Sequence, residues 1–184
     1  MVKHVLNAIP SHQMGVFKIP KKMIKEMDVV QQNFWWNKQE KKGVYFISWD
    51  RVNTYKENGG LGFRDLECFN KSLLAKSVLR LCHSSQQLWA KALKENNFSD
   101  TSVLHSKNKK NTTWAWQSIH GEIGFVHKYK FWLLGDGKNI LTWKDNWITG
   151  EQEPPSTIEE FNLAVSYNTV SDLIDKDTNT WKIS

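Results

Sequence analysis

The chain has 184 residues, of which 40% are hydrophobic and 12% aromatic. This composition predicts one or two small folded units with a modest core and argues against a disordered chain. The formal net charge is +6 at pH 7, which favours an acidic partner such as nucleic acid. Residues 1–150 carry 23 basic against 12 acidic residues, a net +11, whereas residues 151–184 carry 2 against 7, a net −5.

The two cysteines, Cys68 and Cys82, are too few for a metal site of their own and too sparse for a secreted disulfide scaffold. The N-terminus lacks the apolar stretch of a signal peptide, and no run approaches the ~20 apolar residues that span a bilayer. We therefore expect a soluble intracellular protein without membrane contact. Nucleus, cytosol and mitochondrion stay open as compartments, and the oligomeric state stays open too.

The first third of the chain is expected to hold one helix, one strand and a tight turn. Residues 20–36 predict an amphipathic helix, because Pro20 suits a first helical turn and apolar residues recur at helical spacing. The predicted apolar face consists of Met23, Met27, Val30 and Phe34. Residues 44–49 alternate as in a strand with two apolar faces. The three glycines of residues 57–62 predict a tight turn.

Two more helices and a linker are predicted next. Residues 65–81 have the broad apolar face of a buried helix. Ser84 and Gln87 form a capping-box pattern ahead of a short helix that includes Leu88 and Leu93. Residues 99–113 are rich in Ser, Asn, Lys and Thr, and they predict an exposed linker that divides two packing units.

The last third predicts a short helix and a hairpin. Residues 113–121 predict a helix that presents Trp114 and Trp116. Residues 130–134 and 139–143 flank Gly135-Asp136-Gly137, whose Asp-Gly dipeptide favours the turn of a β-hairpin. A weak short helix is expected around residues 170–174.

These elements predict an α+β fold, mainly α with small β elements. The predicted domains are a helical region over residues 1–98, the linker over residues 99–113, a Trp-rich helix-hairpin unit over residues 114–150, and a truncated acidic tail over residues 151–184.

Catalytic motifs are missing from the sequence. Template-directed polymerisation needs paired carboxylates that hold two divalent ions, and the chain has no Asp-Asp dipeptide. The acidic cluster of Asp172, Asp175 and Asp177 is interpreted as a solvated charge run. The six histidines lack the pairwise spacing of zinc ligands, and residues 59–62 lack the lysine of a phosphate loop. We therefore expect no catalytic residue, metal site, cofactor or small-molecule substrate.

Basic residues interleaved with aromatic ones predict a surface that binds RNA or DNA without sequence preference. The candidate nucleic-acid-binding residues are Lys38, Lys41, Lys42 and Arg51 in a first group, and Lys128, Lys130 and Lys138 in a second. A competing interpretation gives the aromatic residues a core role, with the lysines merely at the surface. A third is a structural or interaction protein, with a Trp-rich partner surface and an acidic tail that folds back onto the basic body.

A series of short motifs occurs in a fixed order over nearly the whole chain. The main ones are Asn33-Phe34-Trp35-Trp36, Ile47-Ser48-Trp49-Asp50, residues 56–66, residues 69–76, residues 135–138 and residues 143–147. Together they resemble the segment that follows the reverse-transcriptase domain in plant LINE-type retrotransposon proteins. The motif residues to which the resemblance gives a structural role are Trp35, Trp36, Trp49, Gly59, Gly60, Gly62, Arg64, Asn70, Lys76, Gly135, Asp136, Gly137, Trp143, Asp145 and Trp147.

The resemblance implies a helical, thumb-like N-terminal part and a non-catalytic role. In that family the polymerase active site lies upstream of this segment, and zinc-binding and ribonuclease H regions lie downstream. We therefore expect a fragment of an RNA-directed DNA polymerase protein that lacks the catalytic Asp pair and has no activity of its own. His12, Ser77 and Leu79 stand where the family has aromatic residues, and the loss of aromatic side chains on a packing face leaves cavities.

Overall fold

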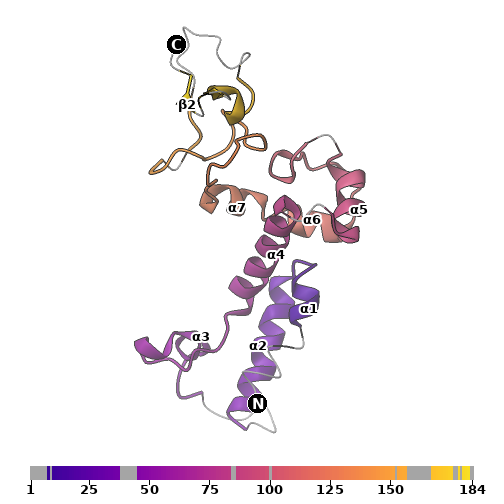
Figure 1. The fold of residues 1–184 in the computed structure, drawn as a ribbon. Coiled ribbons are helices and arrows are strands. Elements are labelled where there is room, and N and C mark those ends of the chain that lie inside the picture. Colours follow the sequence, from indigo (N-terminus) through magenta and orange to yellow (C-terminus); the bar gives the residue numbers. More distant parts are fainter. Residues whose placement is uncertain are drawn as a thin grey trace. The chain divides into compact units, whose positions relative to one another are not determined.

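The computed structural model describes residues 8, 10–37, 45–83, 86–99, 101–151, 153–156, 167–175, 178 and 180–182. The chain divides into two compact units, Met1–Ile123 (unit 1) and Gly124–Ser184 (unit 2), which are described separately. In unit 1 the elements are α1 (Ser11–Met14), α2 (Lys21–Trp35), α3 (Trp49–Asn53), η2 (Lys56–Asn58), α4 (Leu66–His83), α5 (Leu88–Asn97), η3 (Val103–His105) and α6 (Trp114–His120) (Figure 1).

Helix α7 (Ile123–Tyr129) begins at the boundary between the units, and unit 2 continues with η4 (Val170–Leu173), β1 (Ile174–Asp175) and β2 (Thr180–Trp181). The two strands pair antiparallel, with Ile174 opposite Trp181. The predicted fold class, mainly α with small β elements, is confirmed. Within the part of the chain that the structure describes, no helix is long and apolar enough to cross a membrane.

The predicted helix over residues 20–36 is confirmed as α2, which begins directly after Pro20. Its packed face differs from the predicted one. Ile24 is buried in a cluster with Met14 and Leu66, and Met27 packs against this cluster. The other members of the predicted apolar face, Met23, Val30 and Phe34, are 46%, 60% and 54% exposed. Helix α2 therefore contacts α4 through the side that carries Ile24 and Met27.

The predicted strand over residues 44–49 is wrong in its described part. Residues 45–48 form no strand, and Trp49 begins helix α3; residue 44 lies outside the described residues. Trp49 is held by Phe63, with ring centroids 5.1 Å apart, and its Nε1 donates a hydrogen bond to Asp28 Oδ1 at 3.3 Å. A strand needs a partner edge to satisfy its backbone. Here Tyr45, Phe46 and Ile47 are 44%, 82% and 47% exposed, and Trp49 is buried in the first turn of α3.

The predicted tight turn over residues 57–62 is confirmed. Gly59 and Gly62 have φ values of 79° and 63°, which favour glycine. A Cβ at Gly60 would collide with the carbonyl of Thr54. The backbone N–H of Gly62 donates to that same carbonyl at 2.9 Å. These three motif glycines lie in the connection between α3 and α4.

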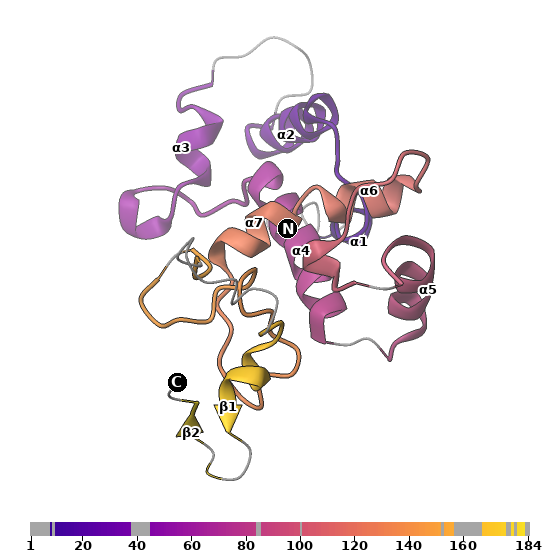
Figure 2. The same cartoon turned by 90° about the horizontal axis from the view of Figure 1, so that it is seen from above.

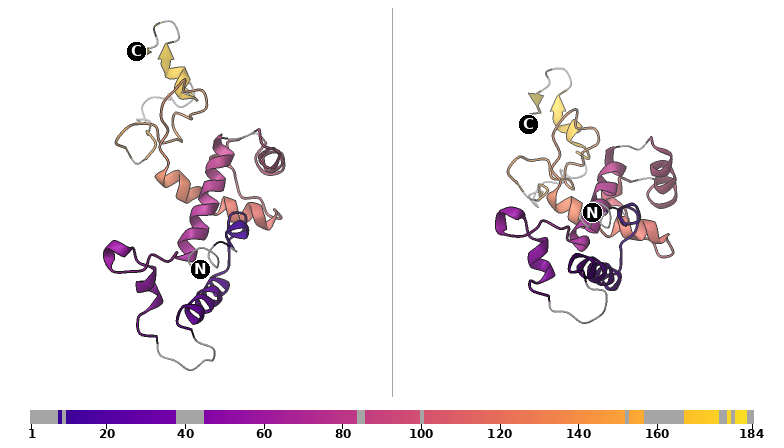
Figure 3. Two further views of the ribbon diagram at one scale, coloured as in Figure 1. Left: turned by 60° about the horizontal axis from the view of Figure 1, so that its bottom comes forward. Right: turned by 90° about the horizontal axis from the view of Figure 1, so that it is seen from below.

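Helix α4 confirms the prediction for residues 65–81 and is the centre of unit 1, in contact with α1, α2, η3 and α6 (Figures 1 and 3). Asn70, which is 3% exposed, joins it to the N-terminal helices. Its Nδ2 donates to the carbonyls of Met14 and Phe17 at 2.7 and 2.9 Å, and its Oδ1 accepts from the Ile19 N–H at 2.8 Å. Asn70 thereby fixes the turn between α1 and α2 on the side of α4.

The short helices predicted after α4 are confirmed as α5 and α6. Gln87 is the N-cap of α5 and makes no side-chain cap hydrogen bond, while Ser84 of the predicted capping box lies outside the described residues. The predicted exposed linker is wrong at Val103 and Leu104. They are 2% and 7% exposed, because η3 packs against α4. The predicted division into domains stays a prediction.

The predicted hairpin over residues 130–143 is wrong: its described residues form no strand pair with one another. The Trp132 N–H donates to the Asn146 carbonyl at 2.9 Å, and Leu141 forms an isolated bridge with Thr169. Gly137 has a φ of 68°, and a Cβ there would lie 2.7 Å from the backbone nitrogen of Ser171. The Gly-Asp-Gly segment therefore meets a later part of the chain.

Residues 167–175, within the predicted acidic tail, take part in the fold of unit 2. The predicted weak helix is confirmed as the 3-10 helix η4, which has a capping box between Thr169 and Asp172. Val170 is fully buried, and its N–H donates to the Ile140 carbonyl at 3.0 Å. Hydrogen bonds from the Thr169 N–H and hydroxyl lower the pKa of the Asp172 carboxyl.

Candidate nucleic-acid interface

Part of the first predicted basic group can be placed. Lys38, Lys41 and Lys42 lie outside the described residues, and Arg51 is exposed in the last turn of α3. The rings predicted beside them pack within unit 1. Trp35 lies edge-on to Phe63, with centroids 5.2 Å apart, and Trp36 lies 5.9 Å from Phe46.

Asp28 is a half-buried carboxylate beside this aromatic cluster. Burial raises its pKa above the ordinary value, and the hydrogen bond from Trp49 Nε1 opposes the rise. The ionised form is therefore less favourable in the folded than in the unfolded chain, so Asp28 destabilises the fold above its raised pKa. This penalty is relieved as the pH falls through that pKa.

Replacing Asp28 with asparagine is expected to raise the urea midpoint of unfolding at pH 7, because the amide oxygen keeps the hydrogen bond to Trp49 without the buried charge. The gain should shrink as the pH falls below the raised pKa, since the wild-type carboxyl is then neutral. The matched Asp28→Ala variant loses the acceptor and should gain less. If the rise in urea midpoint caused by Asp28→Asn did not change with pH, the raised pKa of Asp28 would be contradicted.

The second predicted basic group is engaged within unit 2. Lys138 Nζ lies 3.1 Å from Asp136 Oδ2, and this lysine lowers the pKa of that carboxyl. Lys130 Nζ lies 3.2 Å from the ring centroid of Trp132, a cation–π contact. Lys128 Nζ lies 5.4 Å from the Tyr129 ring. These three lysines therefore contact aromatic rings or a carboxylate of unit 2. Their role in nucleic-acid binding stays a prediction.

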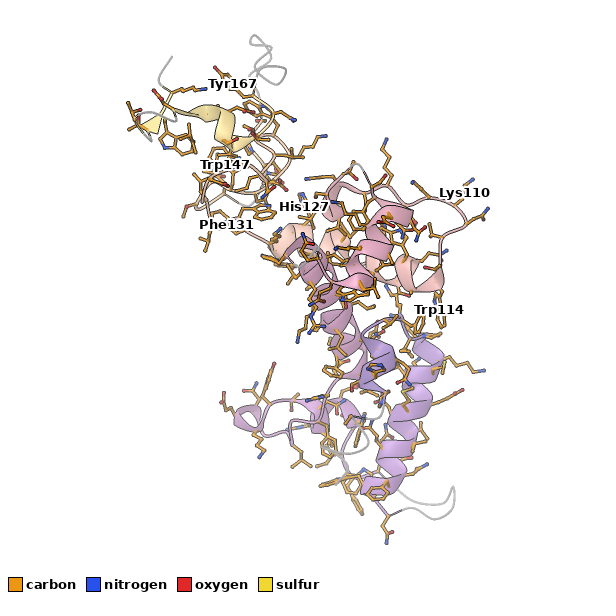
Figure 4. The ribbon with its side chains drawn as sticks, turned by 45° about the vertical axis from the view of Figure 1, so that its right-hand side comes forward. Lys110, Trp114, His127, Phe131, Trp147 and Tyr167 are labelled. Carbon is orange, nitrogen blue, oxygen red and sulfur yellow. The ribbon has the colours of Figure 1, made fainter. Side chains whose placement is uncertain are left out.

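Two motif residues of unit 2, Asp145 and Trp147, form hydrogen bonds with its backbone. Asp145, 3% exposed, accepts from the Leu141 N–H at 2.8 Å. Trp147 Nε1 donates to the Thr142 carbonyl at 2.9 Å; Figure 4 labels Trp147 in unit 2. Trp143 is half-buried, whereas Gly135 is exposed, with open space around it.

Two basic motif residues lie on or beside helix α4 in unit 1. The Arg64 guanidinium lies 4.5 Å from the Phe69 ring centroid, at the start of α4. Lys76, further along the helix, lines a pocket.

This pocket, of about 540 Å³, lies in unit 1 between α1, α4, α5 and α6. Figure 2 shows α1, α5 and α6 beside α4. Its apolar wall includes Leu73 of α4, Leu93 of α5 and Ile119 of α6. The polar and aromatic residues that line it include His12, Lys76, Ser77, Arg80 and Trp89.

The α4 side of the pocket is one stripe of the helix. Leu73, Lys76, Ser77 and Arg80 follow one another at the i, i+3, i+4 and i+7 positions, which share a helix face. Ser77 Oγ donates to the Gly15 carbonyl at 2.9 Å and so fixes the end of α1 against this stripe. His12 and Ser77, where smaller side chains were expected to leave space, both line the pocket; Leu79 does not.

The lining of this pocket is basic. Among the described residues it contains Lys76, Arg80 and His12 but no Asp or Glu. Within the described part of the chain, neither Lys76 nor Arg80 forms an ion pair. A second, shallower hollow on α2 includes Lys21, Lys22 and Lys25, but Glu26 also lines it and Lys21 pairs with Glu67 at 3.0 Å. The pocket on α4 is therefore the stronger candidate for an anionic group.

Sequence reasoning missed Arg80, His12 and Trp89 as site residues and placed Lys76 only among the motif residues. The available signal was the spacing of Lys76 and Arg80, which stand four residues apart on one side of the helix. Across the described residues, no group of three or more His, Cys, Asp or Glu side chains is placed to hold a metal ion.

The fold and pocket describe a mainly helical protein with a basic, apolar-walled site. Sequence comparison shows its relatives in Arabidopsis thaliana. Over 151 residues the chain is 32% identical to "Uncharacterized mitochondrial protein AtMg00310". This match covers 80% of this chain and 97% of that protein. The chain belongs to the same family as this plant protein.

A longer relative matches over a similar stretch. The chain is 30% identical over 156 residues to "Putative ribonuclease H protein At1g65750" of Arabidopsis thaliana. This match covers 82% of this chain. The matched stretch spans 25% of that longer protein. No protein-family model and no solved structure matches the chain.

Proposed function

We propose that this chain is a non-catalytic segment of a plant LINE-type reverse-transcriptase protein, and that the segment serves to bind nucleic acid. The observation that carries the proposal is the match to a quarter of a longer protein whose name refers to ribonuclease H. A segment that recurs both inside a long protein and as most of a short one is expected to be a transferable structural piece. The ordered motif series supports the assignment to this class.

The structural roles of the motif residues support a scaffold rather than a chemical role. Asn70 ties three backbone groups together, Gly60 and Gly137 make close backbone contacts, and Asp145 accepts a backbone hydrogen bond. Nucleotide addition to a growing strand needs two divalent metal ions held by carboxylates. The sequence has no adjacent pair of aspartates to bind them.

The absence of polymerase activity is tested directly. The purified full chain, given a primed RNA template, magnesium and the four deoxynucleotides, is expected to incorporate no nucleotide. A complete reverse transcriptase under the same conditions serves as the positive control. Reproducible incorporation that stays with the chain through further purification would overturn the non-catalytic assignment.

Nucleic-acid binding is supported by the net +11 of residues 1–150 and by the basic pocket on α4. A surface that neutralises phosphates releases counterions, so the affinity should fall steeply as salt rises. Fluorescence anisotropy with a labelled oligonucleotide, repeated from low to physiological salt, measures this slope. Undetectable binding at low salt, or an affinity that salt does not change, would remove this function.

A further inference from the structure

We infer that the pocket between α1, α4, α5 and α6 receives one unstacked nucleotide of a single-stranded nucleic acid. In this arrangement the base lies between the apolar wall and Trp89, and its phosphate lies at Lys76 and Arg80. The inference rests on the proposed nucleic-acid binding and names the site and the strand state that it recognises.

The size and wall of the pocket fit a nucleobase. Its volume of about 540 Å³ falls within the range of roughly 300–1,000 Å³ that is usual for small-molecule sites. Leu73, Leu93 and Ile119 give it an apolar wall. A flat base buries apolar area against such a wall, whereas a bare phosphate or carboxylate leaves it wet.

The cations of the pocket converge on one anion. Lys76 and Arg80 stand four residues apart on α4, which brings their Cβ atoms to roughly 5–6 Å. An arginine guanidinium can grip a phosphate through two parallel N–H bonds, and a lysine adds a point charge. Because no carboxylate of the described residues lines the pocket, neither cation has a competing anion there.

Trp89 supplies the aromatic ring on which the base stacks. It is 37% exposed, and its Nε1 donates to Gln87 Oε1 at 2.6 Å, which restrains the indole. Aromatic side chains stack on any base, so this contact is tolerant of sequence. A base inside a duplex is already stacked and paired and must leave the helix to enter a pocket. The geometry therefore favours a single strand over a duplex.

The test uses the full chain and fluorescence anisotropy at low salt. Three ligands are compared: a labelled oligothymidylate, an abasic oligomer with the same phosphates, and a duplex of the same length. Wild-type protein is expected to bind oligothymidylate about tenfold more tightly than the abasic oligomer, the size of one stacking contact. This comparison needs no variant, so a variant that fails to fold does not affect it.

The variants separate charge from stacking. Lys76→Gln with Arg80→Gln should lower the affinity for both oligomers about tenfold and reduce the salt slope by about 0.7 for each phosphate that is no longer neutralised. Trp89→Ala should abolish the preference for oligothymidylate over the abasic oligomer. The matched control is Lys109→Gln with Lys110→Gln, which removes the same charge outside the pocket and should change affinity less than about threefold. Lys110 points away from the helices of unit 1 (Figure 4).

The outcomes are distinguishable from a failure of nucleic-acid binding itself. Salt-dependent binding with no preference among the three ligands, and equal losses of affinity in the pocket and control variants, would leave the proposed function intact and overturn this site. Full displacement of the oligonucleotide by a polyglutamate peptide at equal charge would also overturn it, since the pocket would then recognise charge alone. No binding by the wild-type chain would overturn both.

Discussion

Replacing Asn70 with alanine is expected to lower the free energy of unfolding of unit 1 by about 3–5 kcal/mol. The Asn70 amide makes three hydrogen bonds, two to the carbonyls of Met14 and Phe17 and one from the Ile19 N–H. Alanine leaves these backbone groups without their partner in a region that water does not reach freely, and each orphaned group costs about 1–3 kcal/mol. Urea unfolding followed by far-ultraviolet circular dichroism measures the change, because the longest helices lie in unit 1.

Two further variants make the Asn70 result specific. Asn96→Ala removes one exposed side-chain hydrogen bond from α5 and should cost less than about 1 kcal/mol. Asn70→Asp keeps the acceptor for Ile19 but places a carboxylate against two carbonyl oxygens, so at pH 7 it should destabilise at least as much as alanine. An Asn70→Ala variant as stable as Asn96→Ala would show that the connection between α1 and α2 is held by other interactions.

Helices α2, α4, α5 and α6 were predictable because their signals are local, whereas α1 and α3 were not predicted. Residues 65–81 carry an apolar face at helical spacing, and α4 (Leu66–His83) follows it almost residue for residue. The orientation of α2 was less accessible. Ile24 and Met27 face the core, whereas Val30 and Phe34 are exposed, because Met14 and Leu66 provide the packing partners and no periodicity within α2 reveals them.

The predicted hairpin over residues 130–143 was wrong because contacts with residues far along the chain determine the local structure there. An alternating pattern and a Gly-Asp-Gly turn favour a hairpin, yet Leu141 pairs with Thr169 and Gly137 packs on the backbone of Ser171. Each of these partners lies roughly 30 residues further along the chain. The tight turn over residues 57–62 succeeded for the opposite reason, since the φ values of its glycines are a local property of the backbone.

The candidate site was beyond sequence reasoning for a related reason. The residues predicted from the basic and aromatic interleaving lie outside the pocket: Arg51 is on α3, and Lys130 lies over the ring of Trp132. The pocket draws on four helices, and their meeting depends on tertiary interactions such as the hydrogen bond from Ser77 to Gly15. Of the pocket, the sequence shows the i, i+4 spacing of Lys76 and Arg80.

Trp116→Ala is expected to lower the free energy of unfolding of unit 1 by about 3–5 kcal/mol. Trp116 is fully buried, stacks on Phe98 with centroids 5.2 Å apart, and lies edge-on to His120 at 5.6 Å. Removing the indole leaves a large cavity beside α4 and α6, which pack together, and a rigid helical core closes such a space only in part. The measurement is again the urea midpoint of the helical signal.

Trp114→Ala is the matched control, because Trp114 lies two residues away on the same helix and is 57% exposed, with one stacking contact to Phe17 at 4.8 Å. It should cost only about 1 kcal/mol. Trp116→Phe should recover much of the stability, because it keeps a ring against Phe98 and removes an Nε1–H that has no hydrogen-bond partner within the described residues. Equal destabilisation by Trp114→Ala and Trp116→Ala would contradict the central place of Trp116, since packing then would not distinguish the two faces of α6.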